Sequence, residues 1–161
     1  MRYLLDTNVI SEQTKPLPNV GVIRRWELDS IFACTSATVW HELWHGIHLL
    51  DEGKRKQGLV GALEILKTSG LPILPFCEQA AEWLALERVR LKRLGLTPPK
   101  YDSEIAAVAV VNNLILVTRN VDDFVMFNGL RVENWFDQVA RQTPSFRSGR
   151  IARVAKPPYV R

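Results

Sequence analysis

Short apolar runs alternate along the chain with longer segments in which apolar residues recur every three or four positions. The short runs predict buried strands, because the central strands of a parallel sheet show no polar alternation. The longer segments predict helices. This alternation predicts an α/β fold, an α/β/α sandwich with a central, mainly parallel sheet. Strands are expected at 3–5, 31–36, 71–75, 114–118 and 130–135, and helices at 20–28, 37–50, 59–67, 78–94 and 102–110.

The segments between these elements carry turn and breaker residues. Residues 11–19 are polar and contain proline, so a loop is expected there. Residues 51–57 form a charged connection, and the helices on either side of it are expected to form a hairpin. Pro72 and Pro75 place the 71–75 strand at an edge of the sheet, because proline cannot donate a ladder hydrogen bond.

The length of 161 residues suits one domain whose core needs no disulfide. Cys34 and Cys77 are the only cysteines and have no zinc-type spacing, which favours a reducing compartment. The start of the chain lacks the apolar region of a signal peptide, and no apolar run approaches the length of a membrane span. These features predict a cytoplasmic protein without a membrane association.

Positive charge is concentrated at the end of the chain. The net charge is +4, but residues 141–161 hold six basic residues and no acid, so residues 1–140 carry −2. A basic segment of this kind can bind phosphate backbones or remain a solvated arm, and the solvated arm is the commoner case. We therefore expect one domain over residues 1–140 and a flexible, Pro/Arg-rich basic tail over residues 141–161.

The first predicted strand ends at Asp6. In open α/β sheets, ligands bind beyond the carboxyl ends of the strands, which is where this carboxylate is expected to lie. The alternative is that Asp6 only caps the turn or helix that follows it. Three later segments carry an acid in a comparable position, namely Glu42 in the second turn of a helix, Asp102 at a helix start and Asp123 after a strand end.

Several carboxylates at one place repel one another. Near a protein surface, two of them about 4 Å apart repel by roughly 4 kcal/mol, so such a group needs protons or a cation. Oxygen ligands without a matching set of Cys or His favour a hard ion, Mg²⁺ or Mn²⁺, which also meets substrate phosphates. The chemistry that this site predicts is metal-assisted hydrolysis of a phosphodiester.

Four segments resemble the motifs of PIN-domain ribonucleases, and most closely those of VapC or FitB-like toxins from type II toxin–antitoxin modules. The likeness covers residues 1–135, with the motifs in the right order and spacing. It is carried by Leu4-Leu5-Asp6-Thr7-Asn8-Val9-Ile10-Ser11, the helix around Glu42, Tyr101-Asp102-Ser103-Glu104-Ile105-Ala106-Ala107 and Val117-Thr118-Arg119-Asn120-Val121-Asp122-Asp123-Phe124.

This resemblance implies a PIN-like nuclease domain that acts as a toxin, a Mg²⁺-dependent endoribonuclease that cleaves RNA phosphodiesters, with Mn²⁺ as the alternative ion. It also implies an RNA substrate, a cognate antitoxin protein that holds the toxin inactive, and a homodimer. By resemblance, the catalytic and metal-binding acids are Asp6, Glu42, Asp102 and Asp123, and polar support comes from Thr7, Asn8, Thr118 and Asn120.

Two positions leave alternatives open. Asn120 stands where some members of the family have Asp, so Asp122 is a second candidate for the fourth acid; Asp123 is preferred because the Asn-x-x-Asp-Phe arrangement fits the toxin branch. Asp102 also fits a helix N-cap, and Glu104 is a nearby rival ligand. The resemblance does not extend to the tail.

A rival motif lies in the second predicted helix. His41-Glu42-Leu43-Trp44-His45 matches His-Glu-x-x-His, in which two histidines bind zinc and the glutamate activates water in a metallohydrolase or protease. His48 is the only other histidine and lacks the spacing of a third ligand. The motif also leaves Asp6 and Asp102 without a role, so the carboxylate nuclease is the preferred hypothesis.

A third hypothesis is a binding module with a degenerate site. The presence of all four acids argues against it. Tryptophans more often belong to cores or interfaces than to nucleic-acid contacts, and Trp40 is expected in the core. Trp44 lies between histidines on the same helix, which makes it a candidate for a subunit or antitoxin contact.

Overall fold

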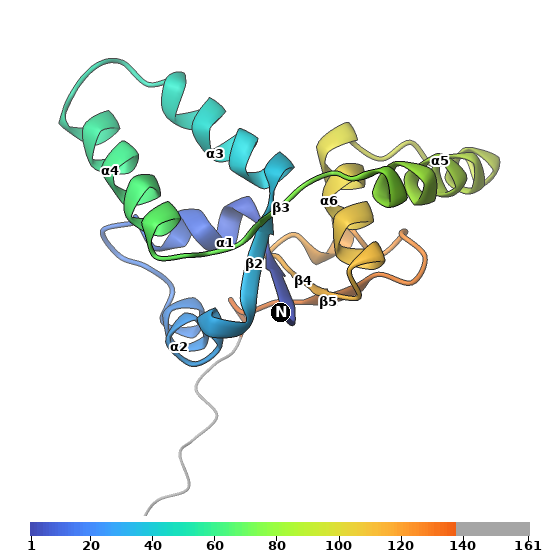
Figure 1. The fold of residues 1–161 in the computed structure, drawn as a ribbon, viewed down its shortest axis with the longest axis horizontal. Coiled ribbons are helices and arrows are strands. Elements are labelled where there is room, and N and C mark those ends of the chain that lie inside the picture. The colour runs from blue at the N-terminus through green and yellow to red at the C-terminus, as the bar shows by residue number, and fades with distance from the viewer. Residues whose placement is uncertain (138–161) are drawn as a thin grey trace, which may run out of the picture.

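Five parallel strands form the central sheet of the computed structural model, which describes residues 1–137 (Figure 1). The strand order is β3-β2-β1-β4-β5. Helices flank the sheet on both sides, so the predicted α/β/α sandwich is confirmed. The strands are β1 (Tyr3–Leu5), β2 (Ala33–Ser36), β3 (Ile73–Leu74), β4 (Ile115–Val117) and β5 (Arg131–Glu133).

The three central strands are buried along their whole length. Leu4 of β1 pairs with Cys34 of β2 on one side and with Leu116 of β4 on the other. The backbone N–H of Asp6 donates to the carbonyl of Val117 at 3.0 Å, which extends the ladder to the carboxyl ends of both strands. Residues that follow β1 and β4 are therefore brought together at one edge of the sheet.

Helix α3 lies at the centre of the helical layers. It packs against α1, α4 and α6, while α5 packs on α6. Figure 1 shows α1 and α4 on one side of the strands and α5 and α6 on the other. The helices are α1 (Thr7–Glu12), α2 (Val20–Asp29), α3 (Ala37–His48), α4 (Lys54–Thr68), α5 (Glu78–Arg93) and α6 (Lys100–Val111), with short 3₁₀ helices η1 (Ser30–Phe32) and η2 (Val121–Asp123).

The structure corrects several boundaries. Helix α1 was not predicted; residues 11–12, expected in a loop, are its end. Helix α4 starts at Lys54, so half of the expected charged connection is helical, and the first two residues of the expected 31–36 strand belong to η1. The proline-flanked strand β3 does lie at an edge, but it has only two residues.

Some apolar residues of the helices face outward. Val20 and Leu28 at the two ends of α2 are 79% and 63% exposed, and Val89 in α5 is 51% exposed. Helical spacing makes Val89 a core candidate, which is wrong, and in α2 the fully buried residue is Val22, in the first turn. Leu84 and Leu91 of α5, which helical spacing also makes core candidates, are buried, and Trp40 packs partly buried against the core.

The basic tail at residues 141–161 lies outside the described residues, as do residues 138–140 of the expected domain. Within residues 1–137, no helix is both long enough and apolar enough to cross a membrane.

A charged pair with one buried member, Glu87, ties α5 to the loop that follows η2. Glu87 is 5% exposed and accepts hydrogen bonds from Arg90 Nε at 2.8 Å and from the backbone N–H of Asn128 at 2.7 Å. Arg90 Nη2 also donates to the carbonyl of Met126 at 2.6 Å. The hydrogen bonds from Arg90 lower the pKa of Glu87. This pair fixes the loop just after Asp123.

Replacing Glu87 by Gln is expected to lower the free energy of unfolding by about 1–3 kcal/mol, because hydrogen bonds to a buried charge are lost. A carboxyl group with a lowered pKa contributes stability above its unfolded pKa and loses it as pH falls through the folded pKa. The difference between wild type and Glu87→Gln in urea unfolding should therefore shrink from pH 7 to pH 4. Glu82→Gln, an exposed position on the same helix, is the control, and an equal effect of both changes would contradict the prediction.

Candidate active site

Asp6 lies at the carboxyl end of β1 and is 7% exposed. Its Oδ1 accepts from the backbone N–H of Thr7 at 2.7 Å, and its Oδ2 accepts from Asn8 Nδ2 and from Thr118 Oγ1, both at 2.7 Å. Asp6 therefore is the N-cap of α1 and also a buried carboxylate at the sheet edge. Burial raises the pKa of Asp6, although these three hydrogen bonds oppose the shift.

Three of the predicted supporting residues form one network around this carboxylate. Thr118 follows β4 and is fully buried. Asn8 Nδ2 also contacts Thr118 Oγ1 at 3.0 Å, and Asn8 Oδ1 accepts from the backbone N–H of Arg119 at 3.0 Å. Asn120 takes part only through its backbone N–H, which donates to Thr118 Oγ1 at 3.1 Å. The network holds the end of β4 against the start of α1.

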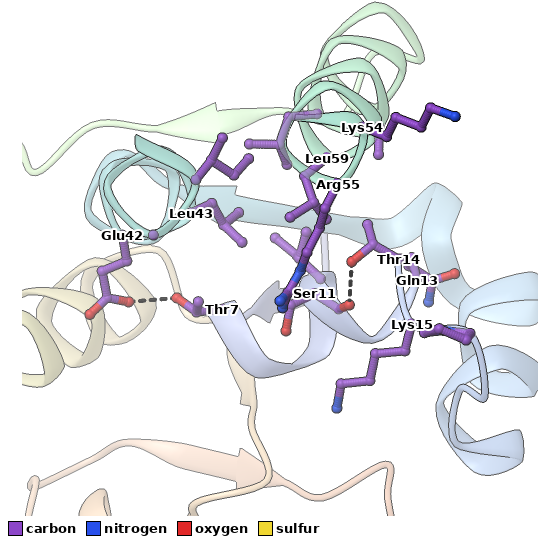
Figure 2. Close-up of a pocket in the computed structure, with 17 residues that line it drawn as sticks. Thr7, Ser11, Gln13, Thr14, Lys15, Glu42, Leu43, Lys54, Arg55 and Leu59 are labelled. Atoms are coloured by element: carbon purple, nitrogen blue, oxygen red, sulfur yellow. Dashed lines mark hydrogen bonds between the residues drawn. The ribbon is translucent and has the colours of Figure 1, made fainter. Parts of the chain in front are cut away.

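Glu42 reaches the same place from α3. Ser36 caps this helix, accepting from the backbone N–H of Val39 at 3.1 Å. Thr7 Oγ1 donates to Glu42 Oε2 at 2.5 Å, as Figure 2 shows. Burial raises the pKa of Glu42, and the charge of Asp6 adds to the shift, while Thr7 and His41 oppose it.

Asp102 lies in the first turn of α6. Its pKa is raised to about 6, first by burial and then by the negative charges of Asp6, Glu42 and Asp123. Helix α6 begins at Lys100, and Pro99 is its N-cap, so the N-cap alternative for Asp102 is wrong. The side chain is thus close enough to three other acids to be repelled by them. We call Asp6, Glu42, Asp102 and Asp123 the acid cluster.

The fourth member of the acid cluster comes from η2. The charge of Asp123 raises the pKa of both Asp6 and Asp102, whereas Asp122 has no such effect on either. Glu104, the rival ligand, accepts from Thr38 Oγ1 at 3.1 Å and lies 3.8 Å from Lys100 Nζ. Glu104 therefore links α6 to α3 and adds no charge effect on Asp102.

Among the described residues, no Lys or Arg forms an ion pair with a member of the acid cluster. Among residues 1–137, no three Asp, Glu, His or Cys side chains are arranged to hold one metal ion, which applies to the carboxylates and the histidines alike. His41 and His45 are exposed, with rings stacked 5.8 Å apart at an interplanar angle of 12°. Neither the fold nor the histidines supports the zinc alternative.

A groove opens beside the Thr7–Glu42 hydrogen bond (Figure 2). It has a volume of about 810 Å³ and lies between α1, α3 and α4. Most of its surface is apolar, and Lys15, Lys54 and Arg55 are among its lining residues. The groove has no signature in the sequence, because α1 is too short to show a helical period and α4 begins five residues before its expected start.

Comparison with known proteins shows the family of the chain. The family model of the PIN domain matches residues 3–127, so the chain belongs to the PIN-domain family. The chain is similar to toxin FitB of Neisseria gonorrhoeae, at 38% identity over 83% of this chain and 99% of that protein. It is also similar to the tRNA(fMet)-specific endonuclease VapC of Salmonella typhimurium, at 29% identity over 84% of this chain and 98% of that protein.

Solved structures give the same result. FitAcB from Neisseria gonorrhoeae matches with a TM-score of 0.73 and 36% identity, over 84% of this chain and 99% of that one. DNA-bound VapBC from Salmonella typhimurium matches with a TM-score of 0.71 and 28% identity, over 84% and 98%. The resemblance to the VapC and FitB-like branch of the family is thereby confirmed.

The raised pKa of Asp102 predicts a stabilising substitution. At pH 7.5 the charged carboxylate of Asp102 lowers the stability of the folded protein, because its folded pKa of about 6 exceeds the ordinary value of 3.8. Asp102→Asn should raise the Tm in EDTA by about 2–4 °C, the shift that about 1 kcal/mol produces in a domain of this size. The gain should shrink at pH 5, where the folded wild type is protonated.

Differential scanning fluorimetry at pH 7.5 and pH 5 measures both values. Glu64→Gln removes an exposed acid from α4 and should leave the Tm unchanged. A lower Tm for Asp102→Asn at pH 7.5, or a gain independent of pH, would show that the acid cluster does not repel in the folded state.

Proposed function

We propose that this chain is the toxin of a type II toxin–antitoxin module and acts as a metal-dependent endoribonuclease. The observation that carries the proposal is the convergence of four acids from four separate segments. In addition to burial, the charge of Asp123 raises the pKa of Asp6, the charge of Asp6 raises that of Glu42, and the charges of all three raise that of Asp102. The relatives support the class of reaction, since they include an endonuclease and several ribonucleases by name.

The donor chemistry of the acid cluster fits a hard divalent cation. All four side chains offer carboxylate oxygens, which suit Mg²⁺ or Mn²⁺. Asp6 accepts three hydrogen bonds and a carboxylate has about four acceptor positions, so at least one remains free. Asp6, Glu42, Asp102 and Asp123 would hold the ion after their side chains turn toward it, because no three of them surround one point among the described residues. When bound, it would activate water and stabilise negative charge on the scissile phosphate and the leaving oxygen.

The chain's own polar groups orient the acids. Thr118 and Asn8 fix Oδ2 of Asp6, and the N–H of Thr7 fixes Oδ1, so this carboxylate has one orientation. The hydroxyl of Thr7 holds Glu42 in the same manner. Because the acids are held before substrate arrives, the attacking water and the phosphate meet a preorganised site.

We also propose a cognate antitoxin as partner. The groove between α1, α3 and α4 supports this, because its apolar lining and the three cations around it suit an amphipathic segment with acidic residues. One end of the groove reaches Thr7 and Glu42, so a segment bound there would lie beside the acid cluster. A homodimer remains a further proposal, supported by the exposed Leu86 and Val89 of α5.

Purified protein, freed of any partner, should cleave a mixed pool of single-stranded RNA in Mg²⁺ or Mn²⁺ and lose this activity in EDTA. Asp6→Asn should lower the rate by about 1,000-fold, since a bound metal contributes several kcal/mol to transition-state stabilisation. Asp51→Asn, an exposed acid between α3 and α4, should retain the wild-type rate. In a bacterial host, the wild type should arrest growth and Asp6→Asn should not.

The same experiment also distinguishes the proposed nuclease from the zinc metallohydrolase alternative. Activity restored after EDTA by Zn²⁺, and by neither Mg²⁺ nor Mn²⁺, together with protease activity, would favour the His-Glu-x-x-His hypothesis. Equal RNA cleavage by wild type and Asp6→Asn would point to a contaminating nuclease and contradict the proposal.

The Thr118 hydroxyl gives a graded test of how the acids are oriented. Thr118→Val keeps the shape but removes the hydrogen bond to Asp6, and it should lower activity or metal affinity by about 10–100-fold. Thr118→Ser retains the hydroxyl and should stay within a few-fold of wild type. Initial rates as a function of Mg²⁺ concentration measure the effect, and equal loss in both variants would mean that packing, rather than this hydrogen bond, is responsible.

A further inference from the structure

Part of the His-Glu-x-x-His segment has no role in the acid cluster. On the outer face of α3, the rings of His41 and His45 stack nearly parallel, 5.8 Å apart. Tyr101 of α6 meets His41 edge-on with ring centroids 5.4 Å apart, and its hydroxyl lies 3.3 Å from His41 Nε2. These three exposed rings, which we call the ring surface, form a continuous patch across two helices.

The ring surface borders the acid cluster. His41 directly precedes Glu42, and Tyr101 directly precedes Asp102. His41 is close enough to Glu42 to lower its pKa. Helices α3 and α6 therefore each carry one acid of the cluster, and the residue just before that acid bears an exposed ring. If one unit of a linear polymer bound at the acid cluster, the units next to it would lie over these rings.

A packing role does not explain the ring surface. Tyr101 is 41% exposed, and His41 and His45 are also exposed. Trp40 and Trp44 on the same helix differ, because both are partly buried against the core. Ordering exposed aromatic rings contributes little to folding, whereas their free faces and edges can be covered by a planar ligand.

We propose that the ring surface stacks unpaired bases of single-stranded RNA and so positions the strand beside the acid cluster, an inference that rests on the proposed ribonuclease function. Without a bound cation the four acids repel the phosphate backbone, so contacts outside the acid cluster are needed to hold RNA. Histidine and tyrosine rings stack on any base, and single-stranded RNA is commonly recognised in this way. Bases on either side of a phosphate at the acids would reach His41, His45 and Tyr101.

Binding can be measured apart from cleavage in the Asp6→Asn background, with a fluorescently labelled single-stranded RNA and anisotropy as the readout. Adding His41→Ala and Tyr101→Ala should raise the Kd by about 5- to 100-fold, the range for loss of one stacked base. The ring-retaining changes His41→Phe and Tyr101→Phe should restore binding to within a few-fold. His48→Ala, an exposed histidine further along α3, is the matched control and should not change the Kd.

Steady-state kinetics of RNA cleavage and the oligomeric state in solution complete the test. With Asp6 intact, the alanine variants should raise KM for RNA more than they lower kcat. Unchanged Kd and KM in variants with a native circular dichroism spectrum, failure of the phenylalanine variants to restore binding, or an equal effect of His48→Ala would each overturn the proposal. A changed oligomeric state by light scattering with unchanged RNA binding would overturn it too and identify a protein interface.

The two proposals fail in different ways. RNA binding that depends on the rings, without metal-dependent cleavage, would keep the ring surface and reject the ribonuclease function. Cleavage that requires Asp6 but does not change when the rings are removed would support the ribonuclease function and reject the ring surface proposal. If the Asp6→Asn protein binds no RNA, the ring surface proposal is rejected.

Discussion

The burial of the Asp6 carboxylate is the constraint on which the rest of the site depends. Removing a carboxylate from water is unfavourable unless hydrogen bonds replace the lost hydration. The turn into α1 supplies two donors, Thr7 N–H and Asn8, and β4 supplies a third, Thr118. The third donor is in reach only because β1 and β4 are neighbours in parallel register, with Leu5 opposite Val117. The order of strands in the sheet thus determines whether Asp6 can be buried as an ion.

The other three acids of the cluster add electrostatic repulsion, which lowers the stability of the protein when no ligand is bound. The charges of Asp6, Glu42 and Asp123 add to the effect of burial on the pKa of Asp102, and stability elsewhere has to offset the repulsion. Two charged contacts hold the surrounding elements in place, since Glu104 and Thr38 link α6 to α3, and Glu87 and Arg90 link α5 to the loop after Asp123. These contacts keep the acids close despite their repulsion. A bound cation would relieve this repulsion, which is the physical reason for proposing a metal site here.

The sequence predicted the features that depend on local pattern. Continuous apolar runs located the three central strands, and the acids at strand ends and helix starts were recognisable because parallel topology brings those ends together. It did not predict α1, whose six residues are too few to show a helical period. The Thr7–Glu42 and Thr38–Glu104 contacts join residues 35 and 66 positions apart, and no local pattern encodes such pairs. The outward direction of Val20 and Leu28 likewise depends on how α2 packs against the rest of the fold.

The His41–His45 segment shows why a short motif is ambiguous until the direction of its helix is known. Residues four apart share a helical face, whereas adjacent residues differ by about 100° around the axis. His41 and His45 therefore point together, and Glu42 points elsewhere. Helix α3 packs between α1 and α6 with the Glu42 side toward Thr7, which places the histidines on the outer face. The same five residues thus contribute a carboxylate to one surface and two rings to another. The packing of α3, and not the motif itself, determines that the two histidines and the glutamate face different surfaces.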